Sequence, residues 1–170
     1  MGVDGHGPVV LALFPMACGS WSYLKKAKAE AKPVAKDLKS KVFQKIVFNM
    51  INRYRKSVKL KPLRLSSALT TISLNHSNEM CKAGKIYHFS PITGRPDARV
   101  KKFGIKPLMI AENVAVASSP KAVVDSWILS TGHRQNLVLK KAIYGGVGIC
   151  KGTIGKTNVY YATFMTSSKF

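Results

Sequence analysis

Acidic residues are scarce in this chain. Of its 170 residues only 7 are Asp or Glu, against 28 Lys and Arg, and the formal net charge is +21. A field of this strength favours anionic surfaces, which include acidic lipid, anionic polymers and nucleic acid. The sequence contains no zinc-finger, RRM-like or P-loop motif, so we do not expect nucleic acid as the partner.

Cysteine is scarce as well. The three residues Cys18, Cys81 and Cys150 form no Cys-x-x-Cys pair. This count excludes the disulfide framework of small secreted domains. Two interpretations of Cys81 and Cys150 stay open: they pair as a disulfide if the protein is exported, or they are two small buried hydrophobic residues.

Long apolar runs are also absent near the N-terminus. The apolar stretch at residues 8–18 is too short to span a bilayer as a helix. It fits the apolar core of an export signal followed by small residues, although no Lys or Arg precedes it. We therefore predict an export or lipoprotein signal at residues 1–20, with Cys18 as the lipidation candidate. The predicted location is extracellular or in the cell envelope.

Residues 21–41 are rich in lysine and alanine and carry no apolar stripe. Such a stretch cannot bury much surface, so we predict a tether or an exposed, partly helical arm. Close to a membrane, each lysine would gain about 1 kcal/mol from acidic head groups. The alternative is that the charge only keeps the arm solvated.

Helical periodicity begins at residue 42. Apolar residues from Phe43 to Val58 recur with the spacing of an amphipathic helix. A second helix is predicted to start after the N-cap Ser66 and to stop at Gly84. A loop-rich stretch follows, with a short helix at residues 97–103.

A third helix is predicted after the short apolar stretch 108–116. Ser118 or Ser119 caps it, and Pro120 stands in the first turn, where its missing N–H costs nothing. Gly132 is predicted to end this helix, so that His133 lies on a loop or on a new helical turn.

The C-terminal part changes to β-rich sequence. We predict strands at residues 145–150 and 158–166, joined by a hairpin loop at 151–157 that contains two glycines. N-terminal helices followed by an antiparallel sheet indicate an α+β domain.

Three polar residues are the candidates for a functional site. His88 and His133 are two of the four histidines, and Glu112 is an acidic residue set among apolar neighbours. Two imidazoles and a carboxylate suit Zn²⁺ or a similar divalent cation, or general acid–base chemistry without a metal. In the structural alternative, His88 bonds to a loop backbone, Glu112 pairs with Arg134, and His133 caps the third helix.

Five motifs in order resemble the CAP superfamily, the domain of cysteine-rich secretory proteins, antigen 5 and pathogenesis-related proteins, in its bacterial SCP-like branch. They are Ile51-Asn52-Arg53-Tyr54-Arg55, His76-Ser77-Asn78-Glu79-Met80, His88-Phe89-Ser90-Pro91, Ala111-Glu112-Asn113-Val114-Ala115, and Trp127 to Asn136 followed by Gly146-Val147-Gly148. Each motif is moderately specific, but five in the right order and spacing are strong. The resemblance assigns residues 42–170 to one such domain.

The resemblance implies a three-layer α-β-α sandwich, an exported protein, and a cleft centred on His88, Glu112 and His133. The residues expected to support this cleft are Asn113, Ser130, Arg134 and Asn136. Ser130 stands where many animal and plant members carry a second glutamate, which weakens the expectation of tight metal binding. Ala111 stands where Gly is usual.

Three functions follow from these residues. The first is a non-enzymatic binding module for a divalent cation or for a small-molecule or lipid ligand. The second is a secreted hydrolase that uses a metal, or Ser90 or Ser130 with a histidine and Glu112. The third is a basic adhesin for an anionic membrane or cell-wall polymer. No oligomeric state is predicted.

Overall fold

The structure, a computed structural model, describes residues 10–11, 38–106 and 108–168. Of the predicted signal at 1–20, only Val10 and Leu11 are described, and Cys18 lies outside the described residues, as does the tether at 21–41 up to residue 37. The first helix of the domain starts at Leu38, so it includes the last residues of the stretch predicted as a tether. Among the described residues, no helix is both long and apolar enough to cross a bilayer.

Five helices and five strands make up the described domain. The helices are α2 (Leu38–Ser57), α3 (Ser67–Ala83), α4 (Pro96–Lys102), α5 (Pro120–Leu129) and α6 (Thr131–Leu137). The strands are β1 (Val10–Leu11), β2 (Arg64–Leu65), β3 (Ile110–Ala117), β4 (Tyr144–Ile154) and β5 (Thr157–Ser167). The order in the sheet is β1-β3-β5-β4-β2. The three long strands are antiparallel, and the two short edge strands pair in parallel with their neighbours.

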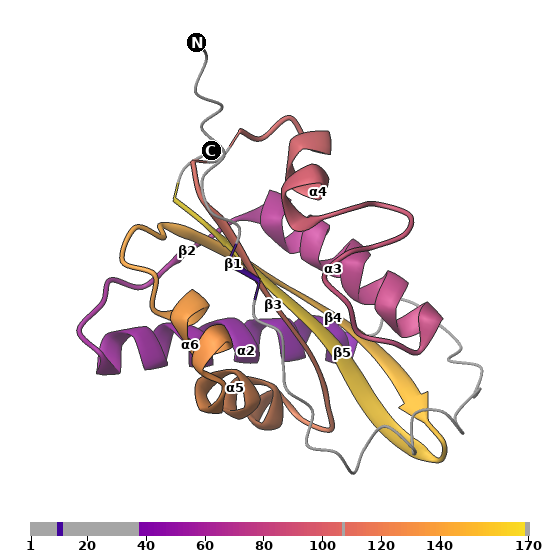
Figure 1. Cartoon of the computed structure of the whole chain (residues 1–170). Helices are drawn as coiled ribbons and strands as arrows, with labels where there is room; N and C mark the ends of the chain where they lie inside the picture. Colours follow the sequence, from indigo (N-terminus) through magenta and orange to yellow (C-terminus); the bar gives the residue numbers. More distant parts are fainter. Residues whose placement is uncertain (1–9, 12–37, 107, 169–170) are drawn as a thin grey trace.

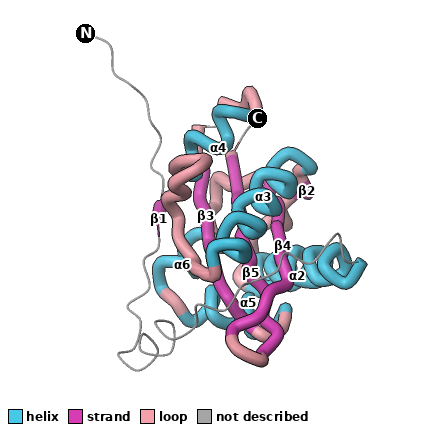
Figure 2. The backbone as a smooth tube through the Cα atoms, turned by 90° about the vertical axis from the view of Figure 1, so that its right-hand side faces the viewer, coloured by secondary structure: helices cyan, strands magenta, loops and turns pink. Residues whose placement is uncertain are grey.

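The helices cover both faces of this sheet, as predicted. Helices α2, α5 and α6 share one apolar cluster with the sheet, and α3 and α4 pack on the opposite face (Figure 1). Figure 2, viewed from the right-hand side of Figure 1, shows α3 lying over β4 and β5. The predicted three-layer α-β-α sandwich is therefore confirmed.

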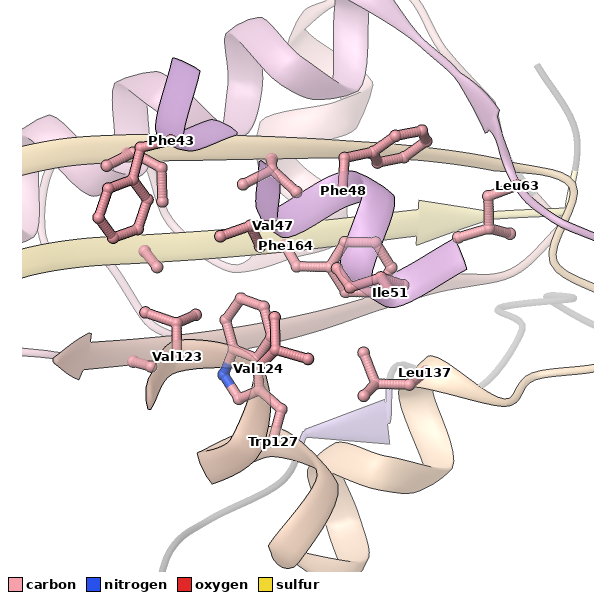
Figure 3. Packing of buried hydrophobic residues seen from close by; sticks show 14 of the residues in the cluster. Phe43, Val47, Phe48, Ile51, Leu63, Val123, Val124, Trp127, Leu137 and Phe164 are labelled. Carbon is pink, nitrogen blue, oxygen red and sulfur yellow. The ribbon is translucent and has the colours of Figure 1, made fainter. Parts of the chain in front are cut away.

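The larger core lies between the sheet and the α2–α5–α6 layer (Figure 3). The rings of Trp127 and Phe164 have centroids 6.1 Å apart, and those of Phe43 and Tyr160 lie 4.0 Å apart. Trp127 also donates its indole N–H to the Val114 carbonyl at 3.2 Å. Burying large aromatic rings stabilises the domain, and this hydrogen bond fixes α5 against β3.

Helix α3 begins and ends where the sequence predicts. The Ser66 side chain accepts from the Leu69 N–H, and Gly84 ends the helix in the left-handed conformation at φ 63°. The helix backbone lies directly on β4. A Cβ at Gly146 would lie 2.3 Å from the Thr70 nitrogen, so only glycine permits this contact.

Two predicted boundaries are wrong. The hairpin loop expected at 151–157 consists only of residues 155–156, because Gly152 to Ile154 continue β4 and pair with β5. The third helix ends at Leu129 rather than at Gly132. Ser130 adopts an extended conformation that breaks the helix, and Gly132 lies inside α6.

Candidate functional site

Glu112 and Asn113 are consecutive residues of β3, and both side chains are fully buried. Because successive strand residues point to opposite faces, one reaches the α3–α4 layer and the other reaches α6. The candidate site therefore has residues on both faces of β3, next to the edge strand β1, which pairs with β3 at Ala111 and Glu112.

Glu112 is held by two partners. Its Oε1 lies 2.9 Å from His88 Nδ1, and its Oε2 accepts from the Nη2 group of Arg99. Because a carboxylate can only accept, His88 Nδ1 donates the hydrogen bond to Glu112. His88 is the most accessible of these three residues, with 10% of its side chain exposed.

Arg99 is the functional residue that the sequence analysis missed. It lies on α4, is 3% exposed, and also donates to the carbonyl oxygens of His88 at 3.0 Å and Gly94 at 2.7 Å. One guanidinium thus fixes the Glu112 carboxylate and the loop that carries His88. A short helix was expected here, but no local pattern distinguishes a buried arginine from the exposed basic residues around it.

His76 and Glu79 of α3 extend the cluster. His76 Nε2 lies 2.8 Å from the Tyr87 carbonyl oxygen and 4.0 Å from Glu112 Oε1. Burial lowers the pKa of His76, since desolvation penalises its charged form. Glu79 accepts a hydrogen bond from the Ser90 hydroxyl, so this hydroxyl does not point its hydrogen at a histidine.

His133 approaches the cluster from α6 and is 2% exposed. Burial, with a smaller contribution from repulsion by His88, lowers its pKa from 6.5 to about 4. The repulsion indicates that the two predicted histidines lie near each other in the fold. At neutral pH the His133 ring is therefore neutral.

The buried side-chain amides of Asn113 and Asn136 hold α6, which carries His133, against β3. Asn113 Nδ2 donates to the His133 carbonyl at 2.9 Å. Asn136 Nδ2 donates to the Glu112 carbonyl at 3.1 Å and to Asn113 Oδ1 at 2.8 Å. Both residues thus bridge β3 and α6 next to His133.

Ser130 and Arg134 lie at the junction of α5 and α6. Ser130 occupies the N-cap position of α6 without a side-chain capping bond. Arg134 donates to the Ile128 carbonyl at 2.9 Å. The alternative pairing of Arg134 with Glu112 is wrong, because Arg99, brought in by α4, takes that place.

A divalent cation fits this arrangement poorly. One oxygen of Glu112 is engaged by His88 and the other by a guanidinium, so a cation would have to displace Arg99 or sit beside its positive charge. Across residues 10–11, 38–106 and 108–168, no three His, Cys, Asp or Glu side chains form a metal-binding group. The cation at His88, Glu112 and His133 remains a prediction.

Comparisons with known proteins identify a family and relatives of the chain. The family model described as "CAP: Cysteine-rich secretory protein family" matches residues 48–165. The uncharacterized protein YkwD of Bacillus subtilis is 33% identical over 107 residues, which are 62% of this chain and 42% of that protein.

Solved structures share the fold at lower identity. An extracellular protein containing an SCP domain from Bacillus anthracis matches with a TM-score of 0.67 and 23% identity, over 80% of this chain and 45% of that one. An outer surface protein of Borrelia burgdorferi matches with a TM-score of 0.70 and 18% identity, over 82% and 99%. The chain thus spans less than half the length of both Bacillus proteins.

Proposed function

Because this chain belongs to the CAP family, the cysteine-rich secretory protein family, we propose that it is an exported, non-enzymatic binding protein whose ligand is an anionic lipid. Export is supported by the predicted signal at residues 1–20. It is also supported by the descriptions of the Bacillus anthracis and Borrelia proteins as extracellular and outer surface proteins.

One surface beside the His88–Glu112 cluster carries the lipid proposal. Phe89 and Ile92, on the loop that holds His88, are 65% and 74% exposed. Phe103 and Leu108, which follow α4, are 46% and 71% exposed. Lys101, Lys102 and Lys106 are exposed among them. We call these seven residues the α4 surface.

The two segments of the α4 surface are joined by Arg99. It belongs to α4 and donates to the backbone of the His88 loop at His88 and Gly94. Exposed apolar side chains among lysines are typical of surfaces that lie on anionic membranes, where burial of apolar side chains adds to attraction by head groups. The apolar side chains would otherwise remain in contact with water.

Co-sedimentation of the full chain with vesicles tests this proposal. We expect binding to phosphatidylglycerol vesicles and much weaker binding to phosphatidylcholine vesicles. Phe89→Ser combined with Ile92→Ser should weaken binding at least about tenfold, since each buried apolar side chain contributes about 1.5–3 kcal/mol. The matched control is Leu65→Ser, which changes a residue 66% exposed on β2, at the opposite edge of the sheet.

Two double lysine variants distinguish binding at the α4 surface from attraction by the overall positive charge of the protein. Lys101→Ala with Lys102→Ala should weaken binding more than Lys140→Ala with Lys141→Ala, although all four lysines are exposed. Equal losses from both pairs, with no loss from the Phe89 and Ile92 changes, would overturn the assignment to the α4 surface.

An anionic polymer is the second candidate ligand. The excess of positive charge over the described residues supports this candidate. Four acidic side chains lie among the described residues, and each contacts a cationic, histidine or hydroxyl group. They are Glu79, Asp97, Glu112 and Asp125. The positive field of the remaining lysines is left uncompensated. Polymer binding through this field should fall steeply with salt and should not respond to the Phe89 and Ile92 changes.

A further inference from the structure

Cys81 and Cys150 meet in the interior, although they are far apart in the sequence. Cys81 lies in the last turn of α3 and is fully buried, and Cys150 lies on β4 and is 4% exposed. Both are free thiols. They share a small apolar cluster with Met80, Val114, Val159 and Tyr161.

The two sulfur atoms converge on one point of β4. Cys81 Sγ lies 3.4 Å from the Lys151 carbonyl oxygen, and Cys150 Sγ lies 3.7 Å from the same oxygen. Both sulfur atoms therefore lie next to the same backbone oxygen of β4. Next to them, a Cβ at Gly152 would lie 3.0 Å from Cys81 Sγ, so the glycine leaves room for the Cys81 sulfur.

We propose that Cys81 and Cys150 form a disulfide that fastens the end of α3 to the sheet once the chain reaches an oxidising compartment. That the disulfide forms in an oxidising compartment rests on the proposed export. That Cys81 pairs with Cys150 rests on the geometry alone. Two buried cysteines that act only as small hydrophobic residues have no need to touch. Here both thiols reach the same Lys151 carbonyl oxygen, one from α3 and one from β4.

The bond forms by thiol–disulfide exchange with an external disulfide such as glutathione disulfide. The Cys81 thiolate attacks one sulfur of that disulfide and releases one glutathione thiolate. The Cys150 thiolate then attacks Cys81 Sγ in the mixed disulfide and releases the second. Two thiol protons leave the protein, and its two electrons reduce the external disulfide to two thiols.

In the folded domain, the neighbouring Cys150 thiol lowers the pKa of Cys81. The same contact and burial raise the pKa of Cys150. Since both sulfurs are inaccessible in the folded domain, exchange takes place during folding, before the last turn of α3 closes on β4.

Refolding the full-length Cys18→Ser variant in a glutathione redox buffer tests the proposal, because this change removes the third thiol. We expect one intramolecular disulfide linking the peptides that contain Cys81 and Cys150, with a loss of about 2 Da by mass spectrometry. At the same buffer ratio, the bridged fraction should be higher under native conditions than in urea. The bridge should raise Tm on the order of 10 °C, because it closes a long loop.

The control is Cys18→Ser with Cys81→Ser, whose Tm should not respond to oxidant. A bridged fraction that is lower in native buffer than in urea, or a lower Tm for the oxidised protein, would overturn the pairing. The redox state of protein recovered from cells is a separate measurement. Bridging in vitro with both thiols reduced in cells would support the geometry and count against export.

Discussion

Arg99 and Glu112 form a buried ion pair that links α4 to β3, with side-chain exposures of 3% and 0%. The pair supplies Glu112 with a positive charge from within the protein. It also fixes His88, because Arg99 donates to the His88 carbonyl while Glu112 accepts from the His88 ring.

Removing Arg99 should be costly. Arg99→Met leaves the Glu112 carboxylate buried without its cation, and we expect a loss of about 3–5 kcal/mol in the free energy of unfolding, measured in urea. The double variant Arg99→Met with Glu112→Leu should recover part of this loss. As a control, Arg95→Met breaks a partly exposed pair with Asp97 and should cost less than about 1 kcal/mol. Equal costs for the Arg99 and Arg95 changes would contradict the role of the buried pair.

Zinc should have little effect on the wild-type protein. A site filled at 100 times its Kd would add about 2.7 kcal/mol to stability and raise Tm by several degrees. Because Arg99 already neutralises Glu112, we expect no such rise in a Zn²⁺ titration followed by thermal unfolding. A rise that disappears in the variant His88→Ala with His133→Ala would instead establish the cation site.

Stability should fall in acid partly because of His133. Its pKa in the folded state is about 4, below the ordinary 6.5, so the unfolded chain binds this proton first as the pH falls. The contribution is fully present above pH 6.5 and is lost toward pH 4, by about 3 kcal/mol. In urea unfolding across this range, His133→Gln should show a shallower decline than the wild type. The pKa of His76 is also lowered, so His76 should account for part of the decline in the free energy of unfolding that remains in His133→Gln. An unchanged slope in His133→Gln would refute this assignment.

The contact between α3 and β4 should not tolerate a methyl group. At Gly148 a Cβ would lie 2.1 Å from the Leu74 nitrogen, a backbone atom that cannot rotate away. We expect Gly148→Ala to cost at least about 3 kcal/mol, or to prevent folding, as measured by circular dichroism and urea unfolding. Thr157→Ala, at an exposed position of β5, is the control and should change stability by less than about 1 kcal/mol. Wild-type stability in Gly148→Ala would mean that the helix is not held this closely.

Most of the fold could be predicted because its signals are local. Ser66 and Gly84 bound α3 as expected, and Ser119 and Pro120 start α5. The hairpin loop was predicted too long because Gly152, taken as a loop residue, lies in β4 beneath Cys81, a contact that only tertiary structure creates. The short parallel strands β1 and β2 carry no periodic pattern that would reveal them.

The site could be predicted only in part. The motif resemblance indicated His88, Glu112 and His133. In the fold His88 bonds to Glu112, and His133 lies near His88. Arg99 could not be predicted, because its identity as the partner of Glu112 depends on how α4 folds over the sheet. The sequence analysis considered Arg134 as the partner of Glu112. In the structure Arg134, on α6, donates to the Ile128 carbonyl near the end of α5 instead.

The position of β5 has a consequence for biosynthesis. It is the last strand in chain order, yet it is the antiparallel partner of both β3 and β4. While the residues after Thr157 are still inside the ribosome, β5 is not available to pair with β3 and β4. The central part of the sheet therefore cannot form at that stage. The nascent chain remains open until translation of the domain is almost complete, and an open chain is the form that can be threaded through a narrow translocation pore.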